Sequence, residues 1–222
     1  MRNINPKQNT TASGFSLLEL IIAMTITIAV MAAASTLLAT SFKIRSREDS
    51  RTDSIADVQR AMNVMSREIA IGGFGFDSVS NGLVAEDCTA STLRVRSNLN
   101  RYTGTDGTQY TIANEGEDIK YLINSNASKK YLVRYDKFAP GDADATVLAN
   151  RVDSLAFIYM DGSGTALADQ TNVTAAAMVR ITVAVDLPEV GTKGVAGYQP
   201  ATTIDLTSDV ALRNKKENIA TY

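Results

Sequence analysis

An apolar run that begins at residue 15 constrains the fold of this chain more than any other feature. Residues 15–39 carry one formal charge, Glu19, and the run is otherwise interrupted only by small residues and five hydroxyl side chains. About 20 apolar residues form a helix long enough to cross a bilayer core of about 30 Å, and a helix satisfies its own backbone as lipid requires. A buried core helix is the alternative, but core helices are rarely this long and this apolar on every face. The run therefore predicts a membrane-spanning helix.

Glu19 is the exception within this run. A carboxylate inside a bilayer costs about 2.5–3.5 kcal/mol on insertion scales, and such residues are usually functional and paired. No basic residue occurs from Ile21 to Phe42, so no cation lies within helical reach on that side. Snorkelling of Glu19 to the interface is the alternative. We expect instead a cationic partner from outside this segment.

The residues before the run are polar and basic. Residues 1–13 include Arg2 and Lys7 and no acidic side chain. The segment is too polar and too short for an ordinary secretory signal, which has its own apolar core followed by a cleavage site. Basic residues do not fix the orientation of the span, because Lys43, Arg45 and Arg47 follow it.

The start of the run resembles the class III signal of type IV pilins and type II secretion pseudopilins, in the sequence Gly14-Phe15-Ser16-Leu17-Leu18-Glu19-Leu20. The resemblance implies that residues 1–14 are a leader and that a prepilin peptidase cuts between Gly14 and Phe15 in the cytoplasm. Phe15 is then N-methylated, and Glu19 pairs with the Phe15 amine of a neighbouring subunit. The product is a single-pass protein of the bacterial inner membrane with an extracytoplasmic domain, which enters a pilus on assembly.

The helix is expected to continue beyond the membrane. No Pro or Gly occurs between Phe15 and Ile71, which predicts one helix about 80 Å long at 1.5 Å per residue. Residues 15–41 form its membrane half and residues 42–71 its amphipathic half. In the second half, apolar residues recur at steps of three and four, and we expect this stripe to pack on a sheet rather than bind a partner: Ile55, Val58, Met62, Met65 and Ile69. Many major pilins carry a proline in the membrane half, and this chain has none there.

The rest of the chain predicts a β-rich domain over residues 72–212, after a glycine-rich helix stop at residues 72–75 and before a polar tail at 213–222. Alternation predicts strands at residues 92–96, 118–123, 130–135, 152–160, 177–187 and 201–212. Asp106-Gly107 is a turn signal. The predicted fold class is α+β, with a long N-terminal helix packed on an antiparallel, pilin-like domain.

Three shorter segments resemble PilW-type minor pilins, and two of these also resemble J-type minor pseudopilins. They are residues 67–75, 152–162 and 210–214. The resemblance implies a minor pilin that takes part in priming or assembly of a type IV pilus. The alternatives are a J-type pseudopilin of a type II secretion system and a membrane-anchored extracytoplasmic binding domain. The implied partners are prepilin peptidase, major and minor pilins, the inner-membrane assembly platform and the lipid bilayer.

Composition gives little support for catalysis. The chain has no His, a formal net charge of −2 and a single cysteine, Cys88. The commonest general base and metal ligand is therefore missing, and the charge does not favour nucleic acid as a partner. Cys88 is expected to be a half-buried small side chain rather than a reactive thiol, because no basic residue adjoins it. We expect a protein without enzymatic activity.

Acidic residues cluster in three places, and none of them predicts a site. Glu86 adjoins Asp87, and Glu115 lies close to Glu117 and Asp118, but nothing in the sequence places two carboxylates in a pocket. A further group with oxygen ligands suited to Ca²⁺ consists of Asp142, Asp144 and Asp161. Its spacing matches no calcium loop, so solvated turn residues are the preferred interpretation, and no cofactor or metal is expected.

Overall fold

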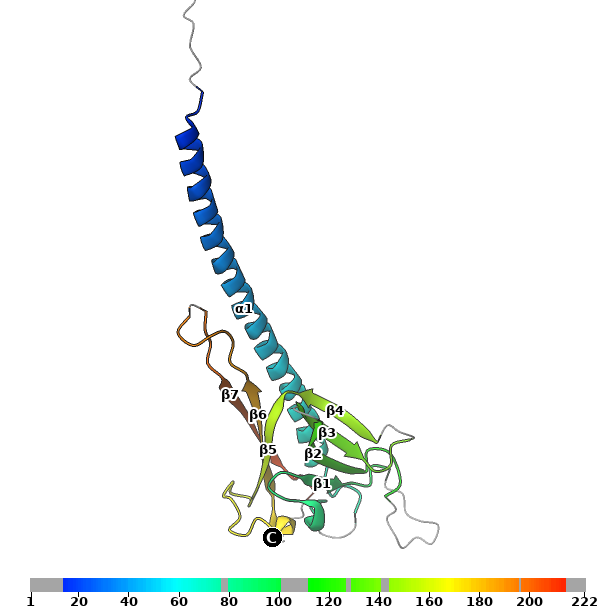
Figure 1. Cartoon of the computed structure of the whole chain (residues 1–222). Coiled ribbons are helices and arrows are strands. Elements are labelled where there is room, and N and C mark those ends of the chain that lie inside the picture. The colour runs from blue at the N-terminus through cyan, green and yellow to red at the C-terminus, as the bar shows by residue number, and fades with distance from the viewer. Residues whose placement is uncertain are drawn as a thin grey trace, which may run out of the picture.

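The computed structural model describes residues 14–76, 80–100, 112–126, 129–140, 144–195 and 197–214. One long helix, α1 (Leu17–Ala70), projects from a domain of two antiparallel sheets that gather around its C-terminal end (Figure 1). This arrangement confirms the predicted α+β class. The turn signal at Asp106-Gly107 and the acidic residue Asp142 lie outside the described residues.

The helix spans 54 residues without a break, as expected from the absence of Gly and Pro. It ends at Ile71, where the chain turns through Gly73 in a left-handed conformation (φ 76°). Asn214 then closes the helix end, because its side-chain amide donates to the Ile71 and Gly72 carbonyls at 3.1 Å each. Carbonyls at a helix C-terminus lack partners within the helix, and that of Ile71 also accepts the Phe74 N–H at 3.0 Å. Asn214, in the segment expected to be a polar tail, thus contacts the helix end.

The two sheets are built from neighbouring strands that all pair antiparallel. The first has the order β1-β2-β3-β4 and consists of β1 (Leu93–Arg96), β2 (Asp118–Asn126), β3 (Lys129–Asp136) and β4 (Ala145–Asn150). The second has the order β5-β6-β7 and consists of β5 (Val152–Met160), β6 (Met178–Leu187) and β7 (Thr202–Ala211). Short 3₁₀ helices cover Ala85–Asp87 and Val173–Ala175.

Most predicted strands are present at nearly the expected positions. The hairpin of β2 and β3 is confirmed, and its pairing continues to Asn126 opposite Lys129. Strand β4 was not predicted. It is the edge strand beyond β3, its first three residues are exposed, and Val147 faces solvent, so its sequence carries no alternating pattern.

The core lies between the second half of α1 and the two sheets. Val58, Met62, Met65 and Ile69 are buried in it, while Ile55 is half-buried. The small residues Ser54, Ala61 and Ala70 are buried on the same side of the helix. The strongest alternating strand, β6, contributes four fully buried side chains: Val179, Ile181, Val183 and Val185. Burying a large apolar side chain contributes about 1.5–3 kcal/mol, so this contact fixes the helix to the domain.

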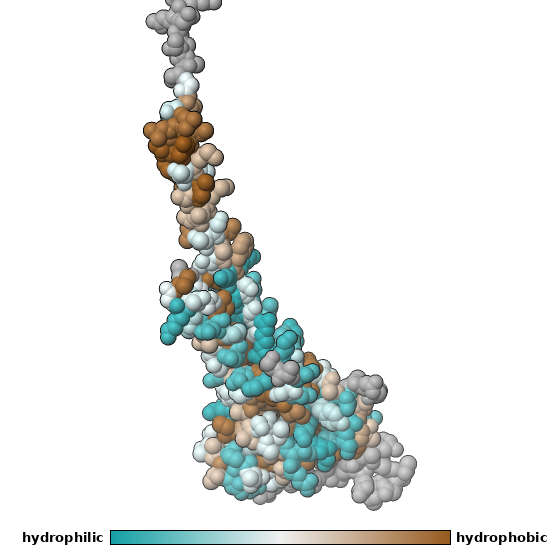
Figure 2. All heavy atoms as spheres, in the orientation of Figure 1, coloured by the Kyte–Doolittle hydropathy of each residue, from teal (hydrophilic) through white to brown (hydrophobic). Residues whose placement is uncertain are grey.

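The first half of α1 has no such cover. Hydrophobic residues gather at its free end, whereas the domain surface is mixed and largely hydrophilic (Figure 2). The molecule therefore divides into an exposed apolar stalk and a packed domain that share one continuous helix.

Candidate functional site

The N-terminal half of α1 is the most unusual surface of the molecule. Every described residue from 14 to 39 is exposed, including Phe15 at 83% and Leu17 at 76%. Among the described residues, α1 is the one helix that is long and apolar enough to cross a membrane by length and composition. Exposed apolar surface on this scale is a contact surface for lipid or for other chains.

Five hydroxyl side chains in this half are paired with the helix's own backbone. Each donates to a carbonyl three or four residues earlier, at 2.7–2.9 Å, in the set Thr25, Thr27, Thr36, Thr40 and Ser41. An unpaired hydroxyl would be costly in hydrocarbon. These residues therefore interrupt the apolar sequence without adding free polar groups to the surface.

The predicted cleavage position is open and lies outside the helix. Gly14 and Phe15 precede α1, and no heavy atom would lie within 4 Å of a Cβ placed on Gly14. Ser16 adopts an extended conformation at the N-cap, and its carbonyl accepts the first helical hydrogen bond from the Leu20 N–H at 3.1 Å. A peptidase can reach an uncovered peptide bond of this kind.

Glu19 lies in the first turn of the helix and is exposed. Unpaired backbone N–H groups at a helix N-terminus give partial relief to a negative charge. Within the described residues no ion pair is formed by Glu19, and the next charged residue along the chain is Lys43, about 36 Å away along the helix. The helix thus presents a carboxylate that no residue in the described part of the chain neutralises.

A polar contact joins the other half of α1 to the first sheet. Glu68 accepts hydrogen bonds from the Tyr121 hydroxyl and from Arg134 Nε, the latter at 3.0 Å. Arg134 also contacts Asp136 at 3.2 Å. Burial and the neighbouring Glu68 carboxylate raise the pKa of Tyr121 well above its usual value. Sequence reasoning missed this group, since Glu68 lies beside the apolar stripe with no pattern to mark its partners.

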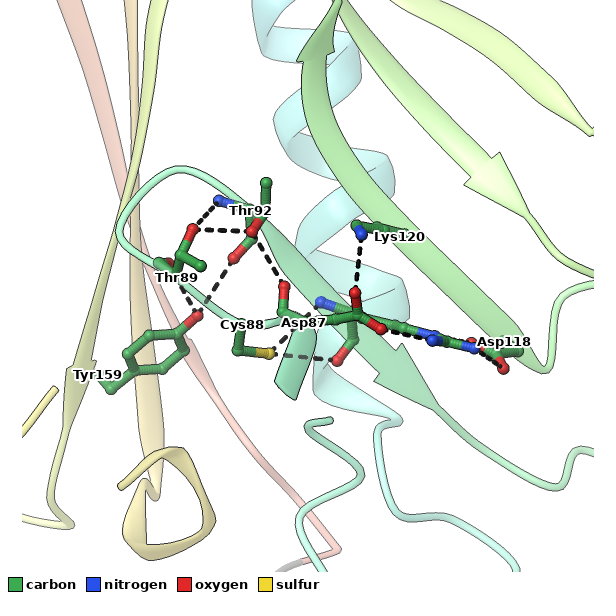
Figure 3. Close-up of polar contacts among 8 residues, drawn as sticks. Asp87, Cys88, Thr89, Thr92, Asp118, Lys120 and Tyr159 are labelled. Carbon is green, nitrogen blue, oxygen red and sulfur yellow. Dashed lines mark hydrogen bonds and ion pairs between the residues drawn. The ribbon is translucent and has the colours of Figure 1, made fainter. Parts of the chain in front are cut away.

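A second polar cluster lies between the 3₁₀ helix Ala85–Asp87 and the first sheet. The Asp87 carboxylate points toward the Lys120 ammonium, 2.8 Å away (Figure 3). Hydrogen bonds from Lys120 and Arg94 lower the pKa of Asp87. Burial alone would raise the pKa of Asp118, but Arg94 and Arg96 lower it overall. Each carboxylate is bound by a cation, so the cluster stabilises the fold and offers no free acid or base.

Cys88 is buried beside this cluster. Its thiol donates to the Arg94 carbonyl at 3.4 Å, and burial raises the pKa of the thiol. Tyr159 lies nearby, and its hydroxyl donates to the Thr89 carbonyl at 3.2 Å (Figure 3). A buried thiol with a raised pKa has little of the thiolate that nucleophilic chemistry requires.

Among the described residues, the carboxylates singled out in the sequence do not form a shared pocket. Glu117 accepts backbone N–H groups of Leu99 and Asn114 at 2.9 Å each, whereas Asp118 binds arginines. Asp161 closes its own turn by accepting the Ser163 N–H at 2.8 Å. In the described part of the chain, no group of three or more His, Cys, Asp or Glu residues could hold a metal ion.

An open groove of about 1130 Å³ runs between α1 and the domain. Its walls carry charges of both signs, from Lys43 and Asp53 on the helix to Arg151 between β4 and β5 and Asp186 on β6. Because the lining carries both signs of charge, it favours neither an anionic nor a cationic ligand.

The comparisons with known proteins give one match. A family model described as the prokaryotic N-terminal methylation motif matches residues 9–35. No curated protein and no solved structure matches the chain. The matched segment contains Gly14, Phe15 and Glu19 and more than half of the exposed apolar helix.

Proposed function

The prepilin-type motif indicates a type IV pilin-like or pseudopilin protein, and within that class we propose that this chain is a minor pilin. In this proposal it inserts in the inner membrane through residues 15–41 and takes part in priming or assembly of a type IV pilus. The observation that carries the proposal is the coincidence of the motif with an exposed apolar half-helix whose other half is packed in a folded domain. We propose a structural role without enzymatic activity.

The first step is processing by prepilin peptidase. In this proposal the cut falls between Gly14 and Phe15, which lie within the matched motif and precede the helix. Cleavage converts the Phe15 amide nitrogen into an amine, which keeps a positive charge after methylation. The leader would face the cytoplasm, and the domain would lie on the extracytoplasmic side.

Glu19 then acts in assembly. Its insertion costs about 2.5–3.5 kcal/mol, whereas the helix N-terminus returns about 0.3–1 kcal/mol and at most about 2. The Phe15 ammonium of a neighbouring subunit would offset the remainder, because opposite charges attract strongly at low dielectric. Pairing requires the amine of one chain to lie level with Glu19 of the next, so the pair also sets the stagger between subunits.

The domain half of α1 keeps the anchor and the domain in one rigid unit. Its apolar face is buried, and Glu68 binds Tyr121 and Arg134 on the first sheet. A force on the membrane half is thereby transmitted to the domain. A minor pseudopilin of a type II secretion system would share all of these features, and the genes neighbouring this one would distinguish the two.

Processing provides the direct test. Intact-mass spectrometry of the membrane-extracted protein should show a chain that begins at Phe15 and carries one methyl group. Gly14→Val should leave the leader attached, since the family peptidases accept small residues at this position, whereas Ser13→Val should be cut normally. Recovery of residues 1–14 on the wild-type protein from cells with active peptidase would refute the proposal.

A further inference from the structure

The connection between β6 and β7 runs back along α1, away from the domain and toward the apolar half of the helix (Figure 1). Its two arms, residues 188–201, are joined by a bridge in which Val190 and Gln199 exchange N–H···O bonds of 2.9 Å each. The connection is thus held together by its own backbone bonds as it extends beyond the sheets.

Gly197 lies directly against Thr40 of the helix. Its φ of 86° suits glycine, and a Cβ at this position would overlap the Thr40 Cγ2 atom. Thr40 is the first half-buried residue of α1, since all described residues before it are exposed. The connection therefore reaches the very end of the uncovered apolar segment.

Arg47 holds the connection at a second point, two turns further along α1. Its guanidinium donates to the Gln199 side-chain oxygen at 2.9 Å and to the Pro200 carbonyl. The contacts at Thr40 and Arg47 lie about 10 Å apart along the helix at 1.5 Å per residue. Two attachment points fix both the position and the direction of the tip relative to the span.

The position of the bilayer follows from the same helix. A bilayer is about 40–45 Å thick with its headgroups, and residues 15–41 cover about 40 Å as a helix, so Thr40 lies in the headgroup layer on the domain side. Lys43, the first charged residue after Glu19, then lies in the headgroup layer. Because Gly197 contacts Thr40, the tip lies at the level of the headgroups rather than above them.

The tip carries side chains suited to that layer. Val195 is 61% exposed although it is apolar, and Lys193 beside it is exposed. An apolar side chain next to a cation fits an interface where hydrocarbon meets lipid phosphate. The charged neighbours Lys43 and Arg45 on the helix face the same layer.

We propose that the tip of the β6–β7 connection, residues 192–195 with Gly197, is a second membrane contact that rests in the headgroup layer on the domain side. This proposal depends on the membrane span of the proposed function. The contact fixes the orientation of the domain relative to the membrane, which a single helix leaves free to rotate. It is released when the subunit leaves the bilayer to join a fibre.

Depth-dependent fluorescence quenching tests the contact on the full-length protein in lipid vesicles. An environment-sensitive fluorophore is attached at Val195→Cys, and the vesicles contain lipids with a nitroxide either on the headgroup or deep in the acyl chain. The native Cys88 is buried, and labelling of the unmodified chain measures its background. We expect a blue shift and a loss of emission that is larger with the headgroup nitroxide.

Two control positions separate quenching caused by the tip contact from quenching caused by the membrane span. Ala29→Cys lies within the span and should be quenched by the deep nitroxide, whereas Ala168→Cys lies on the exposed β5–β6 connection at the other end of the domain and should be unaffected (Figure 1). A quenched Ala29 label with an unquenched Val195 label would overturn the contact but leave the proposed function intact. An unquenched Ala29 label would overturn both.

A matched pair of glycine variants tests whether the contact of Gly197 with Thr40 positions the tip. Gly194 and Gly197 share a φ of 86°, but a Cβ on Gly194 meets no atom within 4 Å. Gly197→Ala should therefore reduce headgroup quenching of the Val195 label, and Gly194→Ala should leave it nearly unchanged. Equal effects of the two variants would contradict the role of the Gly197–Thr40 contact in positioning the tip. Quenching that disappears when protein is diluted in lipid would assign the tip to a neighbouring subunit and overturn the membrane contact.

Discussion

The two halves of α1 form one unbroken helix in opposite surroundings. In the first half every described residue up to 39 is exposed, although most are apolar. In the second half the apolar residues are buried, and polar residues such as Arg60 and Arg67 face outward. Helix propensity alone does not distinguish the halves. The difference lies in what each apolar face meets, which is lipid or other subunits in one case and the protein's own sheets in the other.

The same substitution should therefore have different consequences in the two halves. Met65 is fully buried, and Met65→Asp would place a carboxylate in the core without a partner. We expect it to lower the free energy of unfolding by roughly 2–7 kcal/mol. Thermal unfolding of the purified protein in detergent, followed by near-UV circular dichroism, would measure the loss.

Met31→Asp is the matched variant in the first half, where Met31 is 67% exposed. It should leave the melting temperature of the domain unchanged but impair membrane insertion, at a cost of about 2.5–3.5 kcal/mol. Carbonate extraction of membranes would report that loss. If Met31→Asp destabilised the domain as much as Met65→Asp does, the division of α1 into two halves would be wrong.

The next largest effect on the free energy of unfolding is expected from the polar contact between the second half of α1 and the first sheet. Arg134→Met leaves Glu68 without its cation at a site where both side chains are largely covered, 17% and 15% exposed. Breaking a buried pair costs about 3–5 kcal/mol, and the Tyr121 hydrogen bond should hold the loss to the lower end. Arg60→Met, which removes an exposed pair with Asp57, should cost about 1 kcal/mol or less. Chemical denaturation would measure the loss of unfolding free energy in each variant. Similar losses in the two would show that the buried pair contributes no more than the exposed one.

A smaller effect is expected from pH, through the cluster around Asp118. Arg94 and Arg96 lower the pKa of this carboxyl in the folded protein, so its stabilising effect is complete above its unfolded value of about 3.8. It is lost as pH falls through the lower, folded value. Unfolding curves between pH 5 and pH 2 should show this decline for the wild type.

Arg94→Met should flatten that decline, because Asp118 then loses a cation that lowers its pKa. Arg180→Met removes a more exposed partner, that of Asp209, and should change the pH dependence less. An unchanged acid slope in Arg94→Met would show that this pair contributes nothing to acid stability.

Much of the fold could be predicted because its signals are local. Continuous hydropathy and the absence of Gly and Pro predicted α1, and alternation predicted β5 and β6. Strand β4 was missed, since an exposed edge strand has no buried face to impose a pattern. The partners of Glu68 could not be predicted, because Tyr121 and Arg134 reach it only through the register of β2 and β3. The seat of Gly197 on Thr40 likewise depends on the folded path of the chain.

The proposed assembly site was predictable from sequence for a different reason. Gly14, Phe15 and Glu19 lie within six residues, so their spacing is fixed before folding. In the proposed function, the groups that they bind lie on other molecules. This segment then joins subunits, with Glu19 as the pairing group.

Fibre entry of Glu19→Ala tests this claim most directly. The variant and a matched control, Glu48→Ala on the exposed surface of the second half, would be expressed in place of the wild type, and sheared fibres and membranes would be compared by immunoblot. We expect both variants to insert and to be cleaved at Phe15, and Glu48→Ala to enter fibres while Glu19→Ala stays in the membrane. Glu19→Ala present in sheared fibres at the wild-type level would contradict this claim.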